Sequence, residues 1–192
     1  MKYDLTTQVD QCLMEQWLST QENRHIAAGH VGTHLDTYEK SVIPLDYITC
    51  PGIVWDVSDI AEDREISLSD IENLNIPEHA FLFIYTGRSE KEKYGTADYF
   101  RDHPQLSNEL IQWLTNQPLR FLGIDCSGIR RGKEHEPADR LLEKKGIYVI
   151  ENLCDLNQLL DIDVFKVYTL WFDDPVATGL QCKVVVDTGF ST

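Results

Sequence analysis

The stretch His30-Val31-Gly32-Thr33-His34-Leu35-Asp36 places two imidazoles and a carboxylate around a glycine. These are ligand types that borderline divalent cations such as zinc or manganese accept. On an ideal helix Asp36 would point roughly 160° away from His34, whereas on a strand all three side chains share one face. A straight strand would hold the two histidines about 13 Å apart, so one ion requires a bend, which Gly32 permits. The spacing therefore favours a kinked metal-binding segment, and the alternative is a polar loop with two surface histidines.

Length and composition limit the class of protein to which the chain can belong. A length of 192 residues, 42% of them hydrophobic, predicts one domain over residues 1–192 with a sizeable core. The net charge of −15 argues against a nucleic-acid partner and against attraction to anionic membranes. Five cysteines without a Cys-x-x-Cys pair fit free thiols in a reducing compartment. With no signal-peptide core and no apolar run near 20 residues, we expect a soluble cytoplasmic protein.

Strand-like apolar runs alternate with helix-like segments along the chain. Strands are predicted over residues 2–6, 53–57, 81–85, 121–125, 147–150, 164–172 and 182–187. Helices are predicted over residues 9–18, 106–114 and 138–145, the last of them between Pro137 and Gly146. This alternation indicates an α/β domain.

Four further motifs follow the opening segment in order: Thr86-Gly87, Tyr99-Phe100, Leu122-Gly123-Ile124-Asp125 and Gly146-Ile147 through Glu151-Asn152-Leu153. Together with His-x-Gly-Thr-His-x-Asp, they make the chain similar to the putative cyclase family, which includes kynurenine formamidases and isatin hydrolases. The resemblance covers nearly the whole chain. It implies a swivelling β/β/α fold and metal-dependent hydrolysis of an amide bond, arylformamide-like or lactam, in a small molecule. It also implies a homo-oligomer, either a dimer or a tetramer.

The resemblance also implies a ligand set for one or two divalent ions, zinc first and manganese second. His30, His34 and Asp36 match the family's first three ligands. Glu151 matches the carboxylate that binds a second metal or completes the site. Glu151 also follows an apolar run, where α/β sheets tend to place functional groups. The alternative is a strand-terminal glutamate that turns to solvent.

One departure from the family concerns this ligand set. The family histidine twelve residues before the glutamate falls on Asp139. A carboxylate can replace imidazole on a hard or borderline cation, so Asp139 is a candidate ligand. The alternative is an aspartate that stabilises the first turn of a helix through the helix dipole. His135 could also substitute if its loop bends inward.

A second departure concerns proton transfer. The histidine that serves the family as general acid or base falls on Lys40. A lysine with an ordinary pKa of about 10.4 is a poor base at neutral pH, but it can donate a proton or stabilise an oxyanion. Lys40 and Glu39 are therefore the catalytic candidates, with Tyr38 beside them. The rival hypothesis is a catalytically silent relative that binds a small molecule or a partner protein in the same pocket.

Three other side chains carry weaker expectations. Arg88, at a strand end, is a candidate for binding an anionic group of a substrate. Cys126 is expected to be a small core residue rather than a nucleophile. His103, at an element boundary, is expected to face solvent.

Overall fold

The computed structural model describes residues 1–71 and 74–189. Its strands are β1 (Lys2–Asp4), β2 (His34–Asp36), β3 (Thr49–Asp56), β4 (Ala80–Tyr85), β5 (Leu119–Ile124), β6 (Tyr148–Glu151), β7 (Phe165–Trp171) and β8 (Gly179–Asp187). Its α-helices are α1 (Gln11–Ser19), α2 (Arg24–Gly29), α3 (Arg88–Lys91), α4 (Ala97–Phe100), α5 (Asn108–Leu114) and α6 (His135–Glu143). Short 3₁₀ turns cover Leu45–Ile48, Leu68–Asp70, Gly132–Glu134 and Leu156–Leu159.

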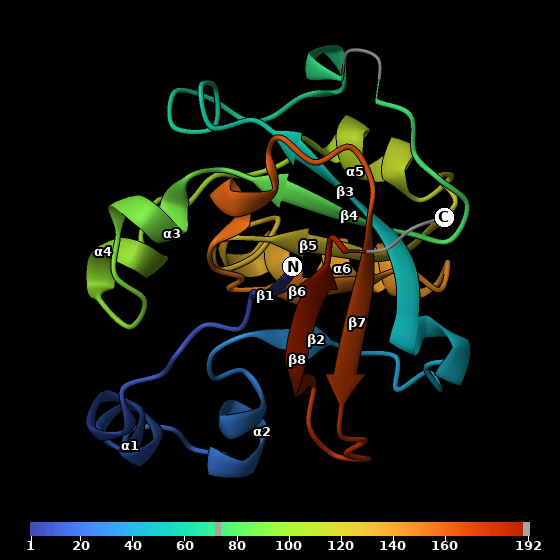
Figure 1. Cartoon of the computed structure of the whole chain (residues 1–192). Helices are drawn as coiled ribbons and strands as arrows, with labels where there is room; N and C mark the ends of the chain where they lie inside the picture. The colour runs from blue at the N-terminus through green and yellow to red at the C-terminus, as the bar shows by residue number, and fades with distance from the viewer. Residues whose placement is uncertain (72–73, 190–192) are drawn as a thin grey trace.

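The strands form one mixed sheet that closes into a barrel (Figure 1). In the described chain the strand order is β1-β8-β2-β6-β5-β4-β3-β7, and β8 also pairs with β7. Seven strands therefore close the barrel, while β1 adds to β8. The pairs from β3 through β6 are parallel, and β2, β7 and β8 join antiparallel. This confirms the α/β class, whereas the swivelling arrangement implied by the resemblance stays a prediction.

Two hydrophobic cores explain why β4 reads as an unbroken apolar run. Phe81 and Phe83 belong to the core that all strands of the barrel share. Leu82 and Ile84 point the other way and pack in a second core with α5 and α6. Successive side chains of a strand face opposite sides, so a strand covered on both sides is apolar throughout.

Most predicted elements are found within a few residues of their expected bounds. The difference that matters is at α6, predicted over residues 138–145 and found at His135–Glu143. Pro137 therefore lies inside the first helical turn, where its missing N–H does no harm. The earlier start brings His135 onto the helix. No helix in the described part of the chain is long and apolar enough to cross a membrane.

Candidate metal centre

The opening segment is kinked at the glycine that the sequence singled out. Helix α2 ends at Gly29, and His30 follows as its C-terminal cap. Gly32 has φ +71°, a left-handed conformation that glycine adopts without strain, and β2 begins two residues later. The bend brings His30 Nδ1 to 3.2 Å from His34 Nε2. Both nitrogens face Asp36 Oδ1, at 3.2 Å and 3.6 Å.

Strand register adds the carboxylate of Glu151. His34 on β2 lies directly opposite Glu151 on the antiparallel strand β6. Their neighbours Leu35 and Ile150 point into the barrel core, so both polar side chains face outward from the barrel. His34 Nε2 lies 3.6 Å from Glu151 Oε2.

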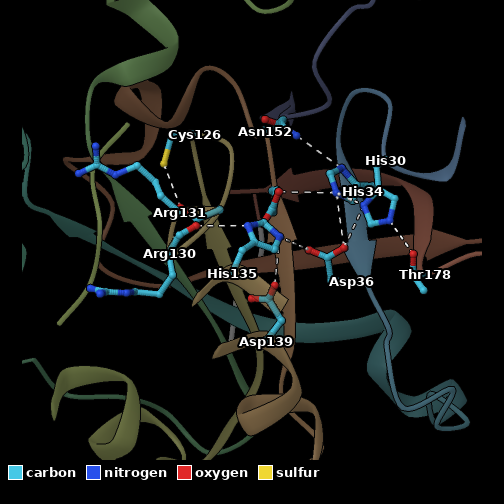
Figure 2. Close-up of polar contacts among 12 residues, drawn as sticks. His30, His34, Asp36, Cys126, Arg130, Arg131, His135, Asp139, Asn152 and Thr178 are labelled. Carbon is cyan, nitrogen blue, oxygen red and sulfur yellow. Dashed lines mark hydrogen bonds and ion pairs between the residues drawn. The ribbon is translucent and has the colours of Figure 1, made fainter. Parts of the chain in front are cut away.

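Helix α6 completes the cluster from the outer side (Figure 2). His135 and Asp139 are one helical turn apart and therefore share a face. His135 Nε2 lies 3.2 Å from Asp139 Oδ2, 3.3 Å from Glu151 Oε1 and 3.7 Å from Asp36 Oδ2. The structure thus brings together every residue that the sequence proposed as a ligand, and His135, offered there only as a substitute for Asp139, lies in the cluster beside it.

In the described chain the six side chains form two overlapping ligand groups, with ligand atoms in each group within 4.8 Å of one another. Asp36 is the residue that both groups contain. The first group is His30, His34 and Asp36, and the second is Asp36, His135, Asp139 and Glu151.

The outward nitrogen of each imidazole is held by the surrounding structure. His34 Nδ1 lies 2.9 Å from the Gly32 carbonyl oxygen, and His135 Nδ1 lies 3.2 Å from that of Arg130. A carbonyl only accepts, so each of these nitrogens carries a proton, and in the neutral imidazole the lone pair of Nε2 points into the cluster. His30 Nε2 is bonded to Thr178 Oγ1 at 2.8 Å. Metal-binding histidines are oriented in this way by a second shell of partners.

Buried carboxylate oxygens in the cluster show that the residues present fit a cation. Within the described chain, both oxygens of Asp36, both of Asp139 and Oε1 of Glu151 accept no hydrogen bond. All three side chains are at most 3% exposed. Burying charge without a partner is strongly unfavourable, and a coordinated metal ion is one of the ways proteins compensate it.

The pKa values of the cluster residues reflect their burial and the closeness of their charges. Burial lowers the pKa of His34 to about 4, so that imidazole is neutral. Burial, followed by the charge of Asp36, holds the pKa values of Asp139 and Glu151 well above their usual range. Burial opposes the charge on His135, but the facing carboxylates of Asp36 and Asp139 prevail and raise its pKa to about 9. In the metal-free protein, a proton on His135 thus takes the place of part of the missing positive charge.

A cavity of about 310 Å³ opens onto the cluster. His30, His34, His135 and Glu151 contribute to its lining. The apolar part of the lining comes from α1 and from the region of α4: Leu13, Met14, Trp17, Tyr94 and Phe100. Leu13, Trp17 and Phe100 are 40%, 43% and 43% exposed, which leaves apolar surface available to a ligand.

The two catalytic candidates from the sequence have their charged ends outside this cluster. Lys40 donates to the carbonyl oxygen of Ala177. Glu39 Oε1 accepts from Arg140 at 2.7 Å. Tyr38 is half-buried, and its ring centre lies 6.4 Å from that of His30. Burial, and after it the carboxylates of the cluster, raise the pKa of Tyr38 above its ordinary value.

The structure differs from two of the three weaker expectations and confirms the burial expected of Cys126, which lies in the hydrophobic core. His103 is 4% exposed rather than solvated, and burial lowers its pKa to about 4. Its Nδ1 lies 3.7 Å from the sulfur of buried Cys126, so that cysteine has a histidine neighbour the sequence did not reveal. Arg88 donates to the backbone carbonyls of Asp98, Tyr99 and Arg101, which occupies the guanidinium expected to bind a substrate.

Sequence reasoning offered His135 only as a substitute ligand, on a loop that would have to bend inward. The available signal was its spacing of four from Asp139, which has meaning only on a helix. Taking Pro137 as the first helical residue put His135 in a loop and hid this signal.

A comparison with protein families decides the chain's membership. The model of a family described as putative cyclase matches residues 3–130. The chain belongs to the putative cyclase family. The match contains the first ligand group and ends before His135, Asp139 and Glu151, so the cyclase-family model does not cover the second half of the cluster. No curated protein matches the chain.

Solved structures resemble this chain over most of its length. A potential metal-dependent hydrolase with cyclase activity is 20% identical with a TM-score of 0.71, covering 97% of this chain and 96% of that one. Isatin hydrolase A from Labrenzia aggregata, bound to benzyl benzoate, is 24% identical with a TM-score of 0.70, covering 82% and 73%. A predicted metal-dependent hydrolase from Bacillus stearothermophilus is 18% identical with a TM-score of 0.66, covering 97% of both chains. At these identities the likeness establishes a shared fold.

Proposed function

We propose that this chain is a metal-dependent hydrolase that cleaves an amide bond of a small molecule, either a lactam or an arylformamide-like amide. The observation that carries the proposal is the set of buried carboxylate oxygens without hydrogen bonds, arranged with inward-facing imidazole nitrogens beside a cavity. Family membership supports it. The solved metal-dependent hydrolases with this fold are consistent with it.

In this proposal one set of residues binds metal and another lines the substrate cavity. His30, His34 and Asp36 would hold one ion, and Asp36, His135, Asp139 and Glu151 a second, with zinc preferred and manganese the alternative for this nitrogen and oxygen donor set. Divalent ions supply Lewis acidity, which activates water and polarises a carbonyl.

The apolar wall formed by Leu13, Met14 and Trp17 provides a surface for an aryl group. None of the described residues lining the cavity is a lysine or arginine, and Asp10 and Glu151 are acidic. An anionic group of a substrate would therefore have to bind through the metal ions, because the described lining contains no lysine or arginine to pair with it.

The test is elemental analysis of untreated protein, combined with a panel of isatin-like lactams, N-aryl formamides and matched esters. We expect bound metal and amide hydrolysis that a chelator abolishes and added zinc or manganese restores. His34→Ala should lose hydrolysis and the ion of its own ligand group. His25→Ala, on an exposed histidine paired with Asp174, is the matched control and should retain both. Metal-free wild-type protein that also fails to bind added zinc or manganese would disprove the proposal.

The rival function is a catalytically silent relative that binds a small molecule or partner protein in the same pocket. It is favoured by the positions of Lys40 and Glu39, whose charged ends bind Ala177 and Arg140. The double variant Lys40→His with Asp139→His restores both family histidines. Amide hydrolysis that appears only in this variant would support the rival, and ready turnover by the parent would remove it.

The finer expectations from the family belong to this proposal as well. They are a swivelling β/β/α arrangement, a cytoplasmic location and a homo-oligomer, either a dimer or a tetramer. Light scattering of the purified protein gives the number of chains directly, and a monomer at micromolar concentration would contradict the last of them.

A further inference from the structure

A further buried carboxylate lies next to the metal centre, but its oxygens accept hydrogen bonds from the polypeptide chain. Glu143 is the last residue of α6 and is 4% exposed. In the described chain its oxygens accept hydrogen bonds from three backbone N–H groups and two hydroxyls. The donors are Thr37 Oγ1 (2.9 Å), Tyr38 N (2.7 Å), Glu39 N (2.8 Å), Ser41 N (3.3 Å) and Ser41 Oγ (2.8 Å).

These donors all come from residues 37–41, the segment that leaves β2 directly after Asp36. The segment is neither helix nor strand, and although the Thr37 N–H still bonds to the Thr178 carbonyl oxygen, the N–H groups of Tyr38, Glu39 and Ser41 bond to Glu143 instead of to a strand. Lys40 has φ +55°, an unfavourable conformation for a residue other than glycine. A path that curls around one carboxylate accounts for both features, because the N–H groups must converge on the same two oxygens.

The same face of α6 that binds this segment also carries metal ligand candidates. His135, Asp139 and Glu143 are spaced by four residues, one helical turn each. The first two face the cluster, and the third binds the segment that follows Asp36. One rigid helix therefore fixes both its own ligands and the chain end of the strand that carries His34 and Asp36.

The segment also places an aromatic side chain beside the centre. Tyr38 donates its backbone N–H to Glu143, and its ring lies beside the His30 ring. On its other side Arg140 of α6 lies 5.5 Å from the ring centre. If the Tyr38 N–H lost its hydrogen bond to Glu143, the Tyr38 ring would therefore be free to move away from the His30 side of the cluster.

We propose that Glu143 is a positioning residue of the metal centre, which holds residues 37–41 against α6 and thereby fixes Asp36 and Tyr38 relative to His135 and Asp139. The role requires the metal centre of the proposed function but not amide hydrolysis. It does not make Glu143 a ligand or a catalytic residue.

The experiment compares Glu143→Gln with Glu136→Gln. The first replaces a carboxylate oxygen with an NH₂ group that cannot accept the N–H donors. The second makes the same change on an exposed residue of α6 that pairs with Arg140. Two measurements are made on each protein: amide hydrogen exchange in the metal-free state, and titration with cobalt(II) chloride followed by its visible absorption.

In Glu143→Gln we expect the amides of Tyr38, Glu39 and Ser41 to exchange about tenfold faster or more, since their acceptor is lost. The cobalt spectrum should change in shape and the cobalt affinity should fall about tenfold or more, in line with the loss of other residues that orient ligands. Glu136→Gln should match the wild type in both measurements. A purely structural role for Glu143 would lower stability without altering the cobalt spectrum of the folded protein.

The outcomes separate this inference from the proposed function. Wild-type protein that binds no cobalt would refute the metal centre itself, and the positioning role with it. Wild-type binding together with an unchanged spectrum, affinity and exchange in Glu143→Gln would overturn the positioning role alone. If Glu143→Gln does not fold, Ser41→Ala, which removes one hydroxyl donor, decides instead. A faster exchange of the Tyr38 and Glu39 amides with a shifted cobalt spectrum supports the role, and wild-type behaviour overturns it.

Discussion

At the scale of single residues, Asp36 lies between the two halves of the metal centre. Its two oxygens face different imidazoles: Oδ1 faces His30 and His34, and Oδ2 faces His135. Although burial opposes ionisation, these imidazoles hold its pKa below the usual range. Asp36 is therefore ionised while neighbouring Glu151 resists ionisation, and it is the residue that would contribute to the binding of either cation.

Ligand substitutions should consequently differ in how much metal they remove. We expect Asp36→Ala to lose all bound zinc, because both ligand groups contain this residue. His30→Ala and His135→Ala should each lose the ion of one group and keep much of the other. Metal content per chain after dialysis against a fixed free zinc concentration measures this. Equal losses in all three variants would contradict two separable ion positions.

The raised pKa of His135 predicts how the metal-free protein responds to pH. Its folded pKa is about 9 and its ordinary value 6.5, so between these values the folded protein binds a proton that the unfolded chain releases. Stability should therefore be highest below about pH 6.5 and fall by up to about 3 kcal/mol as pH rises to 9. The raised pKa values of Asp139 and Glu151 act in the same direction.

Urea denaturation of the chelator-treated protein at several pH values measures this slope. Saturating zinc should flatten it, because a bound cation replaces the proton. His135→Gln should also flatten it, while His25→Gln, on the exposed surface, should not. Stability that rises between pH 6.5 and 9 in the metal-free protein would contradict the assignment.

The sequence predicts some ligand residues from their spacing and others only from the family motif, and the difference has a physical reason. His30, His34 and Asp36 are close in the chain, so their spacing limits their geometry, whereas Glu151 entered through the family motif. The burial of His103 depends on packing between distant elements, which no local pattern encodes. The same holds for the partners of Lys40 and Glu39.

At the scale of elements, the bend at Gly32 and the pairing of β2 with β6 assemble the centre. A shift of one residue in that pairing would move His34 into the barrel and Leu35 out. The bend was predictable because the histidines cannot meet without it. The start of α6 was not, because Pro137 is compatible with several positions in a first helical turn.

Replacing Gly32 by alanine should therefore damage the metal centre. An added Cβ would lie 2.8 Å from a methyl group of Val9, at a φ that disfavours any side chain. Gly132→Ala is the control, since its φ is also positive but no atom of the described chain lies within 4 Å of its Cβ. Both should lose about 1 kcal/mol to backbone strain. Only Gly32→Ala should also lose zinc affinity, as measured by competition with a chelator. Equal zinc affinity in both variants would contradict this role of the bend.

At the scale of the whole molecule, a barrel with an inner and an outer core supports a site on its outer surface. The alternation of strands and helices predicts the class of fold, but closure depends on the pairing of β7 with both β3 and β8. Such pairings join segments far apart in sequence and leave no periodic signal. For this reason the sequence could indicate an α/β domain and not a closed barrel.

Two phenylalanines, one in the core of the barrel and one in the wall of the cavity, should respond differently to substitution. Phe83 is fully buried inside the barrel, so Phe83→Ala should lower the free energy of unfolding by about 3–5 kcal/mol. Phe100 is 43% exposed at the cavity, so Phe100→Ala should change it by less than about 1 kcal/mol but weaken binding of an aryl ligand. Urea denaturation and calorimetric titration with an aryl amide measure the two effects. A larger loss of stability for Phe100→Ala than for Phe83→Ala would contradict this division.

The regular spacing along α6 also has a consequence for the history of the chain. A one-residue insertion between Asp139 and Glu143 would rotate one relative to the other by about 100° and place them on different faces. Insertions and deletions in this helix should therefore be absent from any relative that keeps the same anchor. The pattern His-x₃-Asp-x₃-Glu-x₇-Glu, downstream of His-x-Gly-Thr-His-x-Asp, is a signature with which such relatives can be sought in genomes. It would distinguish them from members of the family that have a histidine in place of Asp139.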